Sequence, residues 1–130
     1  MKLAVIGAGS WGTTYAKILA DSGNEVALYS RRADLAEEIN THKRNSDYLP
    51  GITLPQSIKA TNDLALAVAD AEQVYLAIPS STLREFLDEN KALFGSALVV
   101  SLMKGLEPNS QQRMSQLITE STGIDQSKVV

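Results

Sequence analysis

The chain alternates between short apolar runs and longer stretches in which apolar residues recur at helical spacing. The runs are bounded by glycine, proline or charged residues, which is typical of strands buried on both faces of a parallel sheet. They predict strands at 3–6, 25–30, 58–61, 74–78 and 97–102. The stretches between them predict helices over 10–22, from Asp34, from Asn62, from Thr82 and around 114–118. This alternation indicates an α/β fold of the doubly wound Rossmann type, with a mostly parallel sheet and helices on both faces.

Two segments do not fit this alternation. Residues 42–57 are rich in Asn, Gly and Pro and predict a long irregular loop, and such loops in compact domains are usually functional or disordered. Val129-Val130 resembles the start of a sixth strand, and a doubly wound unit does not normally end two residues into a strand. We therefore expect residues 1–130 to form one dinucleotide-binding domain, the N-terminal part of a longer two-domain protein truncated at its sixth strand.

Length and composition are those of one ordinary globular domain, with 130 residues of which 44% are hydrophobic and 21% charged. The net charge of −3 counts against a general nucleic-acid binder, because such proteins are normally basic. The absence of cysteine excludes disulfides, zinc–thiolate sites and cysteine nucleophiles, and we expect the single histidine, His42, to be exposed rather than catalytic. No apolar run approaches the roughly 20 residues of a membrane span, and the first residues do not form a signal peptide. A cytoplasmic protein without membrane insertion is expected.

A glycine-rich loop joins the first predicted strand to the first predicted helix. Gly7, Gly9 and Gly12 match the pattern G-x-G-x-x-G, which is specific for dinucleotides only in this strand-to-helix context. The first glycine permits the tight turn, the second lets a pyrophosphate approach the backbone, and the third lets the helix pack close to the strand. Ser10 is well placed for a phosphate or ribose, whereas Trp11 either covers the cofactor or fills an apolar gap. The alternative is a glycine-rich turn without a ligand.

The end of the second strand bears on the choice of dinucleotide. NAD-binding domains usually place an acidic residue there to hold the ribose 2′-hydroxyl, but this strand is followed by Arg31 and Arg32, with no carboxylate before Asp34. An arginine fork pairs well with a 2′-phosphate. The two arginines therefore favour NADPH, with NADH left open as a second cofactor, unless they are only solvated surface residues.

The later strands end in residues that suit the other half of such a site. Pro79 and Ser80 follow the fourth strand, and Lys104 and Gly105 follow the fifth. Ligands of doubly wound folds lie outside the carboxyl ends of the strands, so both ends would border the nicotinamide. Lys104 suits an anionic substrate group or is an ordinary surface lysine, and Ser80 either caps a helix or touches the cofactor. We find no paired carboxylates of catalytic character and no metal-ligand cluster.

Several motifs taken together carry a more specific resemblance. They are Gly7-Ala8-Gly9-Ser10-Trp11-Gly12-Thr13, Arg31-Arg32, Asn45, Tyr48-Leu49-Pro50-Gly51-Ile52, Leu54-Pro55, Pro79-Ser80 and Lys104-Gly105-Leu106-Glu107. In this order they resemble the NAD(P)-dependent glycerol-3-phosphate dehydrogenase family of bacteria, over essentially the whole chain. Thr14-Tyr15 departs from the Ala-Leu usual in the family, where we expect only repacking of the helix.

The resemblance implies a function. The family reduces dihydroxyacetone phosphate to sn-glycerol 3-phosphate with NAD(P)H, for phospholipid synthesis. Its cofactor contacts map onto Ser10, Trp11, Arg31, Arg32, Tyr48 and Lys104. Lys104 also maps onto a substrate contact, whereas the general acid–base lysine and the helical second domain are expected beyond Val130. The chain alone should therefore bind cofactor without turnover, and the full-length protein should form a homodimer. The edge of the fifth strand should make the chain prone to edge pairing or swapping.

Two alternatives remain at this stage. One is the cofactor domain of another two-domain NADP reductase, of the ketopantoate or β-hydroxyacid type, against which the Tyr-Leu-Pro-Gly and Lys-Gly-Leu-Glu segments count. The other is a free-standing NADP-sensing module without a catalytic partner. The reading frame of the gene after Val130 separates this module from a fragment of a reductase.

Overall fold

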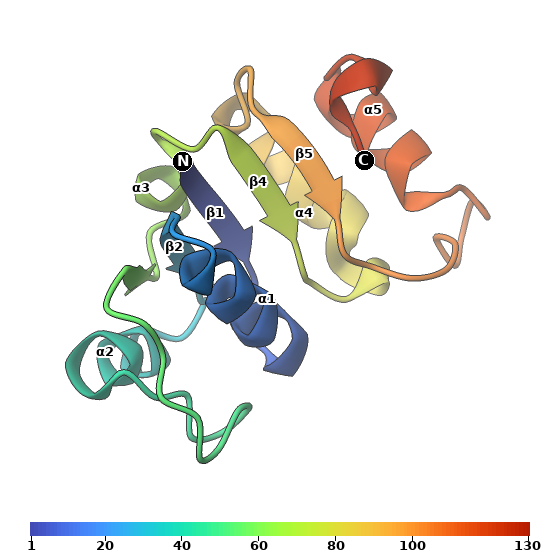
Figure 1. Cartoon of the computed structure of the whole chain (residues 1–130). Coiled ribbons are helices and arrows are strands. Elements are labelled where there is room, and N and C mark those ends of the chain that lie inside the picture. The colour runs from blue at the N-terminus through green and yellow to red at the C-terminus, as the bar shows by residue number, and fades with distance from the viewer.

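The computed structural model describes all residues 1–130 and contains five strands and five α-helices in strict alternation (Figure 1). In chain order these are β1 Lys2–Ile6, α1 Ser10–Asp21, β2 Glu25–Tyr29, α2 Ala33–His42, β3 Ile58–Thr61, α3 Leu64–Val68, β4 Gln73–Leu76, α4 Leu83–Asn90, β5 Leu98–Ser101 and α5 Met114–Thr122. Short 3₁₀ turns flank α4 and follow α5. No helix is both long and apolar enough to cross a membrane.

The five strands form one parallel sheet in the order β3-β2-β1-β4-β5. Ala4 of β1 lies beside Ala27 of β2 and beside Val74 of β4, so β1 is the central strand. The chain moves outward from β1 to β3 and then crosses to β4 on the other side of β1. The predicted doubly wound fold is therefore confirmed, and its switch point lies between β1 and β4, where such folds bind their ligands.

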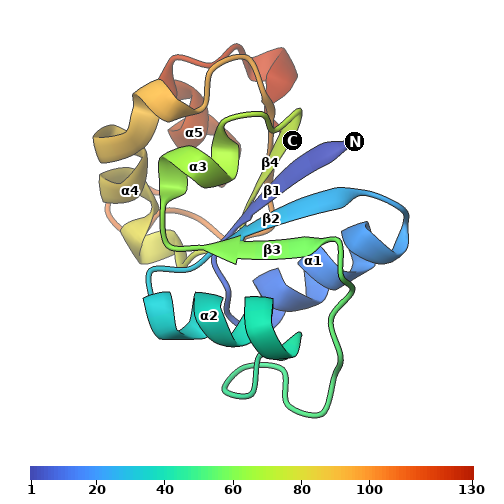
Figure 2. The same ribbon diagram turned by 90° about the vertical axis from the view of Figure 1, so that its left-hand side faces the viewer.

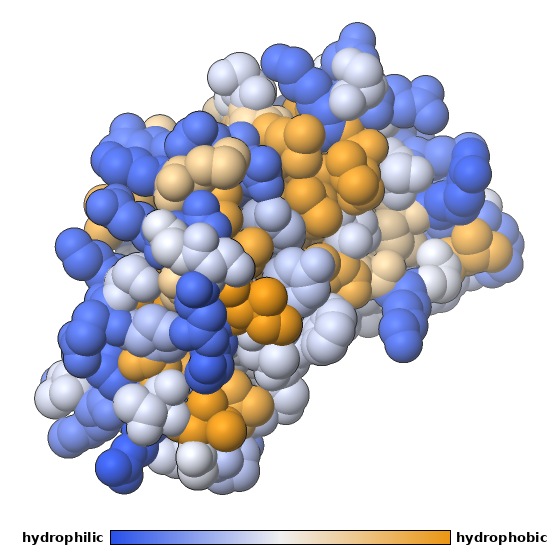
Figure 3. Space-filling view, viewed as in Figure 1, coloured by the Kyte–Doolittle hydropathy of each residue, from blue (hydrophilic) through white to orange (hydrophobic).

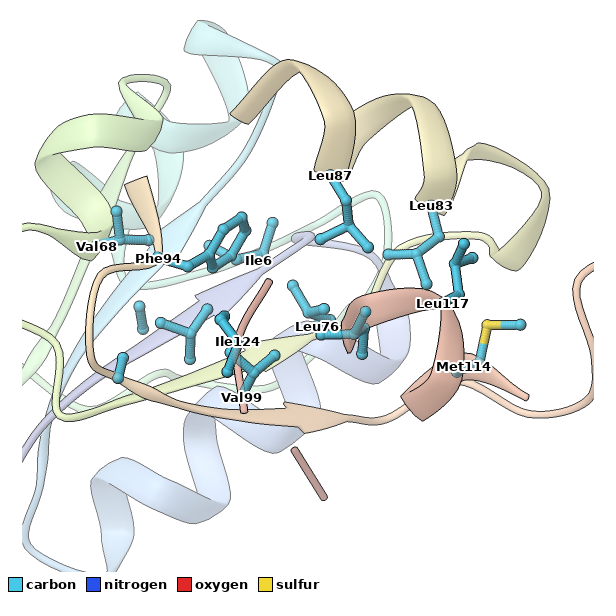
Figure 4. Close-up of a cluster of buried hydrophobic side chains, with 14 of the residues drawn as sticks. Ile6, Val68, Leu76, Leu83, Leu87, Phe94, Val99, Met114, Leu117 and Ile124 are labelled. Carbon is cyan, nitrogen blue, oxygen red and sulfur yellow. The ribbon is translucent and has the colours of Figure 1, made fainter. Parts of the chain in front are cut away.

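Two hydrophobic layers hold the helices to the sheet. Helices α1 and α2 cover one face, and α3, α4 and α5 cover the other (Figure 2). Because side chains alternate along a strand, Val5 faces the first layer, whereas Ala4 and Ile6 face the second. In the second layer, Leu87 of α4 and Leu117 of α5 are fully buried against the sheet (Figure 4). Both faces of β1 are thus buried, which explains its uninterrupted apolar run.

The outer side of β5 pairs with the last two residues. The Val130 N–H donates to the Val99 carbonyl at 2.9 Å, and the Ser101 N–H donates to the Val130 carbonyl at 2.7 Å. Val129 and Val130 therefore lie parallel beside β5, in the place predicted for a sixth strand. On the face shared with α1, β5 is less covered, and apolar side chains gather over it at the surface (Figure 3). Leu98 and Val100 are only half-buried there.

Two helix starts differ from the sequence prediction. Helix α2 begins at Ala33, and its N-cap is Arg32, two residues before the predicted cap Asp34; no side chain caps this helix. The Asp34 carboxylate pairs with Arg32 instead. Helix α3 is capped by Asp63 and not by Asn62, since Asp63 Oδ1 accepts from the Leu66 N–H at 3.1 Å. An ionised carboxylate is the stronger acceptor for a free helix N–H group.

The start of α4 and the end of β4 also differ in detail. Thr82 is the N-cap of α4 as predicted, but its hydroxyl donates to the Pro79 carbonyl at 3.0 Å and accepts no cap hydrogen bond. Strand β4 ends at Leu76, two residues before the predicted end at Ile78. The Ala77 N–H makes the last hydrogen bond to β1, at the Ile6 carbonyl, and the chain then turns away from the sheet.

Candidate functional site

The glycine loop between β1 and α1 is shaped by close contacts of its own backbone. Gly7 has a φ of 111°, and a Cβ there would lie 2.4 Å from the Ala77 carbonyl oxygen. A Cβ on Gly12 would lie 1.8 Å from the Gly7 carbonyl oxygen. At Gly9 a Cβ would meet nothing within 4 Å, because this residue faces open space. The structure therefore supports the predicted division of labour, with two glycines needed by the fold and one that leaves room for a ligand.

The loop leads directly into the free N-terminus of α1. The helix begins at Ser10 with Gly9 as N-cap, no side chain caps it, and its first turn contains no acidic residue. The first N–H groups of an α-helix have no partner inside the helix and carry about half a positive charge. The N-terminal end of α1 can thus bind an anion such as a phosphate.

Hydrogen bonds of the Asn45 side chain hold the long loop of residues 43–57 against the glycine loop. Its side chain is buried, and Nδ2 donates to the Ala8 carbonyl at 2.9 Å and to the Thr13 hydroxyl at 2.8 Å. Its Oδ1 accepts from the Tyr48 N–H at 3.2 Å. These bonds place Tyr48 beside the glycine loop. The sequence prediction included Asn45 in the family resemblance but gave it no role, because an asparagine in a loop carries no spacing signal.

Two adjoining hollows lie at the carboxyl ends of the strands. The larger, of about 830 Å³, is lined by nine of the predicted cofactor-binding residues, namely Gly7, Gly9, Ser10, Trp11, Gly12, Arg31, Arg32, Tyr48 and Pro79. The smaller, of about 280 Å³, shares Trp11 and Pro79 with the larger and is bordered by Lys104. The fold thus brings all ten predicted residues to one side of the molecule, whereas the exposed His42 lies outside both hollows.

Sequence reasoning missed the contribution of α3 and α4 to the larger hollow. These helices add Leu64, Glu85, Phe86, Glu89 and Asn90 to its lining, and the N-cap of α4 adds Thr82. The available signal was the position of α4, which directly follows the carboxyl end of β4 and therefore begins at the edge of the site.

Trp11 lies at the rim where the two hollows meet. It is 55% exposed, its ring stands edge-on to Tyr15 with centroids 5.6 Å apart, and Tyr15 in turn contacts Tyr75. The indole therefore does not fill a gap in the core, which was one of the two predicted roles. Its position fits the other role, that of a cover for a ligand.

The two arginines after β2 are not equivalent. The Arg32 guanidinium donates from Nε and Nη2 to Asp34 at 3.2 and 2.7 Å, and from Nη1 to Asp47 at 2.7 Å. These contacts raise the pKa of Arg32, and the contact with Arg32 lowers the pKa of Asp34. The guanidinium of Arg31 is exposed and makes no ion pair.

The segment that follows Lys104 is tied to α4 through Glu107. This carboxylate is buried and accepts from Arg84 Nε at 2.7 Å and from Arg84 Nη2 at 2.9 Å, and the Ser110 hydroxyl also donates to it. The hydrogen bonds from Arg84 and Ser110 lower the pKa of Glu107 to about 2. Glu107 belongs to the Lys-Gly-Leu-Glu segment, so this ion pair fixes the stretch of chain that carries Lys104.

Acidification is expected to weaken the fold through Glu107. Its pKa of about 2 in the folded chain lies below its ordinary value of 4.5, so the unfolded chain binds this proton more readily. The stabilisation is complete above pH 4.5 and is lost as the pH falls from there towards 2. Urea midpoints across this range should therefore change less for Glu107→Gln than for the wild type. Glu120→Gln, at an exposed carboxylate 3.7 Å from Arg84, serves as the control. Parallel profiles for the wild type and Glu107→Gln would contradict the expectation.

Comparison with known proteins identifies the family. The sequence profile described as the N-terminus of NAD-dependent glycerol-3-phosphate dehydrogenase matches residues 2–130. The chain belongs to this family. A glycerol-3-phosphate dehydrogenase [NAD(P)+] of Leifsonia xyli is 52% identical over 126 residues, which are 96% of this chain and 34% of that protein. The enzyme of the same name from Corynebacterium jeikeium is 49% identical over 99% of this chain and 39% of its own length.

A solved structure from the glycerol-3-phosphate dehydrogenase family has the same fold. The crystal structure of glycerol-3-phosphate dehydrogenase from Coxiella burnetii superposes with a TM-score of 0.85 at 29% identity, covering 94% of this chain and 38% of that one. The chain thus spans a little over a third of the length of the curated relatives it matches. The family predicted from the motifs is confirmed, and both relatives carry the name glycerol-3-phosphate dehydrogenase [NAD(P)+].

Proposed function

We propose that the chain is the NAD(P)-binding domain of a glycerol-3-phosphate dehydrogenase. The observation that carries this proposal is the glycine loop, which presents an open Gly9 and the free N-terminus of α1 to a large hollow at the switch point of the sheet. This is the arrangement by which Rossmann folds bind a dinucleotide pyrophosphate. Family membership supports the same function and counts against the ketopantoate and β-hydroxyacid types of reductase.

The residues around the larger hollow fit the parts of a dinucleotide. Ser10 and the first N–H groups of α1 would hold the pyrophosphate above Gly9. The corner formed by Arg31 and Arg32 would receive the adenosine ribose, with Tyr48 from the long loop beside it. Pro79 and Trp11 border both hollows and would flank the nicotinamide end. When bound, the nicotinamide would supply or accept the hydride.

Lys104 is proposed as the contact shared by cofactor and substrate. It is exposed at the edge of the smaller hollow, and its ammonium group suits the phosphate of dihydroxyacetone phosphate or sn-glycerol 3-phosphate. We assign no catalytic acid or base to residues 1–130 and propose that this chain by itself binds cofactor without turnover. For the full-length protein we propose reduction of dihydroxyacetone phosphate in phospholipid synthesis, as a cytoplasmic homodimer.

Cofactor binding tests this proposal directly. Trp11 is the single tryptophan and borders both hollows, so its fluorescence should change when NADPH or NADH binds. We expect a dissociation constant for NADPH in the micromolar range, about −8 kcal/mol, measured by this signal and by calorimetry. Nicotinamide mononucleotide lacks the adenosine half and should bind far more weakly. Absence of binding by both dinucleotides would contradict the proposal.

A turnover assay tests whether catalysis requires residues outside this chain. The purified chain should not oxidise NADPH when dihydroxyacetone phosphate is added, whereas the product of the full reading frame should do so. Reduction by the chain alone, with contaminating enzyme excluded, would contradict the proposal that catalytic residues lie outside it. A stop codon directly after Val130 would favour the NADP-sensing module.

A further inference from the structure

At the corner of the larger hollow beyond β2, two carboxylates that do not themselves line the hollow pair with one of its two arginines. Arg31 and Arg32 both line the hollow, but Asp34 and Asp47 converge on the guanidinium of Arg32. Asp34 engages its Nε and Nη2 as a fork, and Asp47 engages Nη1, so every nitrogen of this guanidinium donates to a carboxylate. Arg31 makes no such contact. The corner therefore contains one neutralised arginine and one free arginine.

The two carboxylates come from different parts of the chain. Asp34 lies in the first turn of α2, where a negative charge is favoured by the helix dipole. That position alone would explain Asp34 as a stabilising residue. Asp47 has no such explanation, because it lies in the long loop, between Asn45, which is buried against the glycine loop, and Tyr48, which lines the hollow. The loop thus delivers a second carboxylate to Arg32 across fifteen positions of sequence.

This arrangement affects the two dinucleotides differently. A 2′-phosphate carries about two negative charges. To bind Arg32, it must displace a carboxylate or lie close to two of them, and like charges repel. The 2′-hydroxyl of NADH is neutral and can donate to a carboxylate, as it does to the acidic residue of NAD-binding domains. Asp34 and Asp47, which both hold the Arg32 guanidinium, would therefore oppose the charged phosphate more than the neutral hydroxyl.

We propose that Asp34 and Asp47 are specificity-determining residues, which lower the preference for NADPH by occupying Arg32 and leave Arg31 as the main partner of the 2′-phosphate. This inference rests on the proposed function, since it requires a dinucleotide in the larger hollow. It also replaces the simpler prediction that both arginines act together on the phosphate. The chain would then accept NADH and NADPH with similar affinities, and the balance would be set by the carboxylates.

The test is the ratio of the dissociation constants for NADH and NADPH. In the double variant Asp34→Asn/Asp47→Asn, NADPH should bind about tenfold more tightly, a change of about 1.4 kcal/mol, while NADH binding should not strengthen. The control Asp21→Asn/Asp70→Asn makes the same change in net charge at carboxylates that pair with Lys17 and Lys2 and not with Arg32, and it should leave the ratio near that of the wild type. Added salt should reduce the gain of the first variant, because salt screens exposed charges.

Arginine variants provide an independent arm. Arg31→Ala should weaken NADPH binding about tenfold, and adding Arg32→Ala to the double aspartate variant should remove the gain of that variant, because the gain comes from the freed Arg32. Both side chains are exposed, so neither substitution should unfold the chain. An unchanged ratio in the double aspartate variant, or a gain in that variant that survives Arg32→Ala, would overturn this inference and leave the proposed function intact. Failure of the wild type to bind either dinucleotide would overturn both.

Discussion

Gly12→Ala is expected to lower the free energy of unfolding by about 3 kcal/mol or more. In an ordinary helix position this change would stabilise the chain by about 1 kcal/mol, because alanine is the better helix former. Here the added Cβ would lie 1.8 Å from the Gly7 carbonyl oxygen, so the backbone of the glycine loop has to move. Steric overlap with backbone therefore outweighs helix propensity. Urea denaturation followed by circular dichroism measures the effect.

The clash also opposes any local adjustment. Gly7 is held on its other side by Ala77, whose carbonyl oxygen would lie 2.4 Å from a Cβ on Gly7, so the loop cannot retreat towards β4. We expect the variant to be largely unfolded or to lose both hollows. A Gly12→Ala chain that is as stable as the wild type would show that the glycine loop does not adopt the described geometry.

Gly9→Ala is expected to separate binding from stability. A Cβ on Gly9 meets no atom within 4 Å, and the backbone there is extended with φ −75° and ψ −172°, which alanine adopts readily. The free energy of unfolding should therefore stay within about 0.5 kcal/mol of the wild type. Dinucleotide binding should weaken at least about tenfold, since the methyl group occupies the space through which a pyrophosphate approaches the backbone.

The two glycine variants control one another. Both insert one methyl group into the same loop, so a shared effect on stability would point to a general intolerance of the loop. Calorimetric titration of NADPH into Gly9→Ala measures the loss, with thermal unfolding on the same sample. Binding that equals the wild type would contradict the placement of the pyrophosphate over Gly9 and with it the proposed function of the loop.

The fold followed from the sequence because its strongest signals are local. Apolar runs such as 3–6 are buried on both faces, and each is followed by an amphipathic helix, which allows few topologies other than a doubly wound sheet. Helix starts were less predictable. Asp34 and Asn62 are both residue types that often cap helices, but which residue caps a helix depends on competing partners in space. Asp34 pairs with Arg32, and Asp63 caps α3 in place of Asn62.

The sequence predicted which residues gather at the site, but it did not predict which of them pair with one another. The glycine loop has a fixed spacing, and the ends of parallel strands meet at one edge, so the residues that would gather there could be named in advance. The pairing of Arg32 with Asp47 could not be named in advance, because it depends on the path of an irregular loop. The buried bonds of Asn45 and the pair of Arg84 with Glu107 are equally long-range. Such contacts leave no periodic signal in a single sequence.

The pairing of Arg84 with Glu107 makes α4 a mechanical link between the two hollows. The side of α4 that carries Glu85, Phe86 and Glu89 walls the larger hollow, while Arg84 grips the segment that begins at Lys104 beside the smaller one. Two parallel hydrogen bonds resist rotation as well as separation, so the segment has to follow the helix. A ligand in the larger hollow that displaces α4 would therefore also displace Lys104, because the pair of Arg84 with Glu107 couples the two.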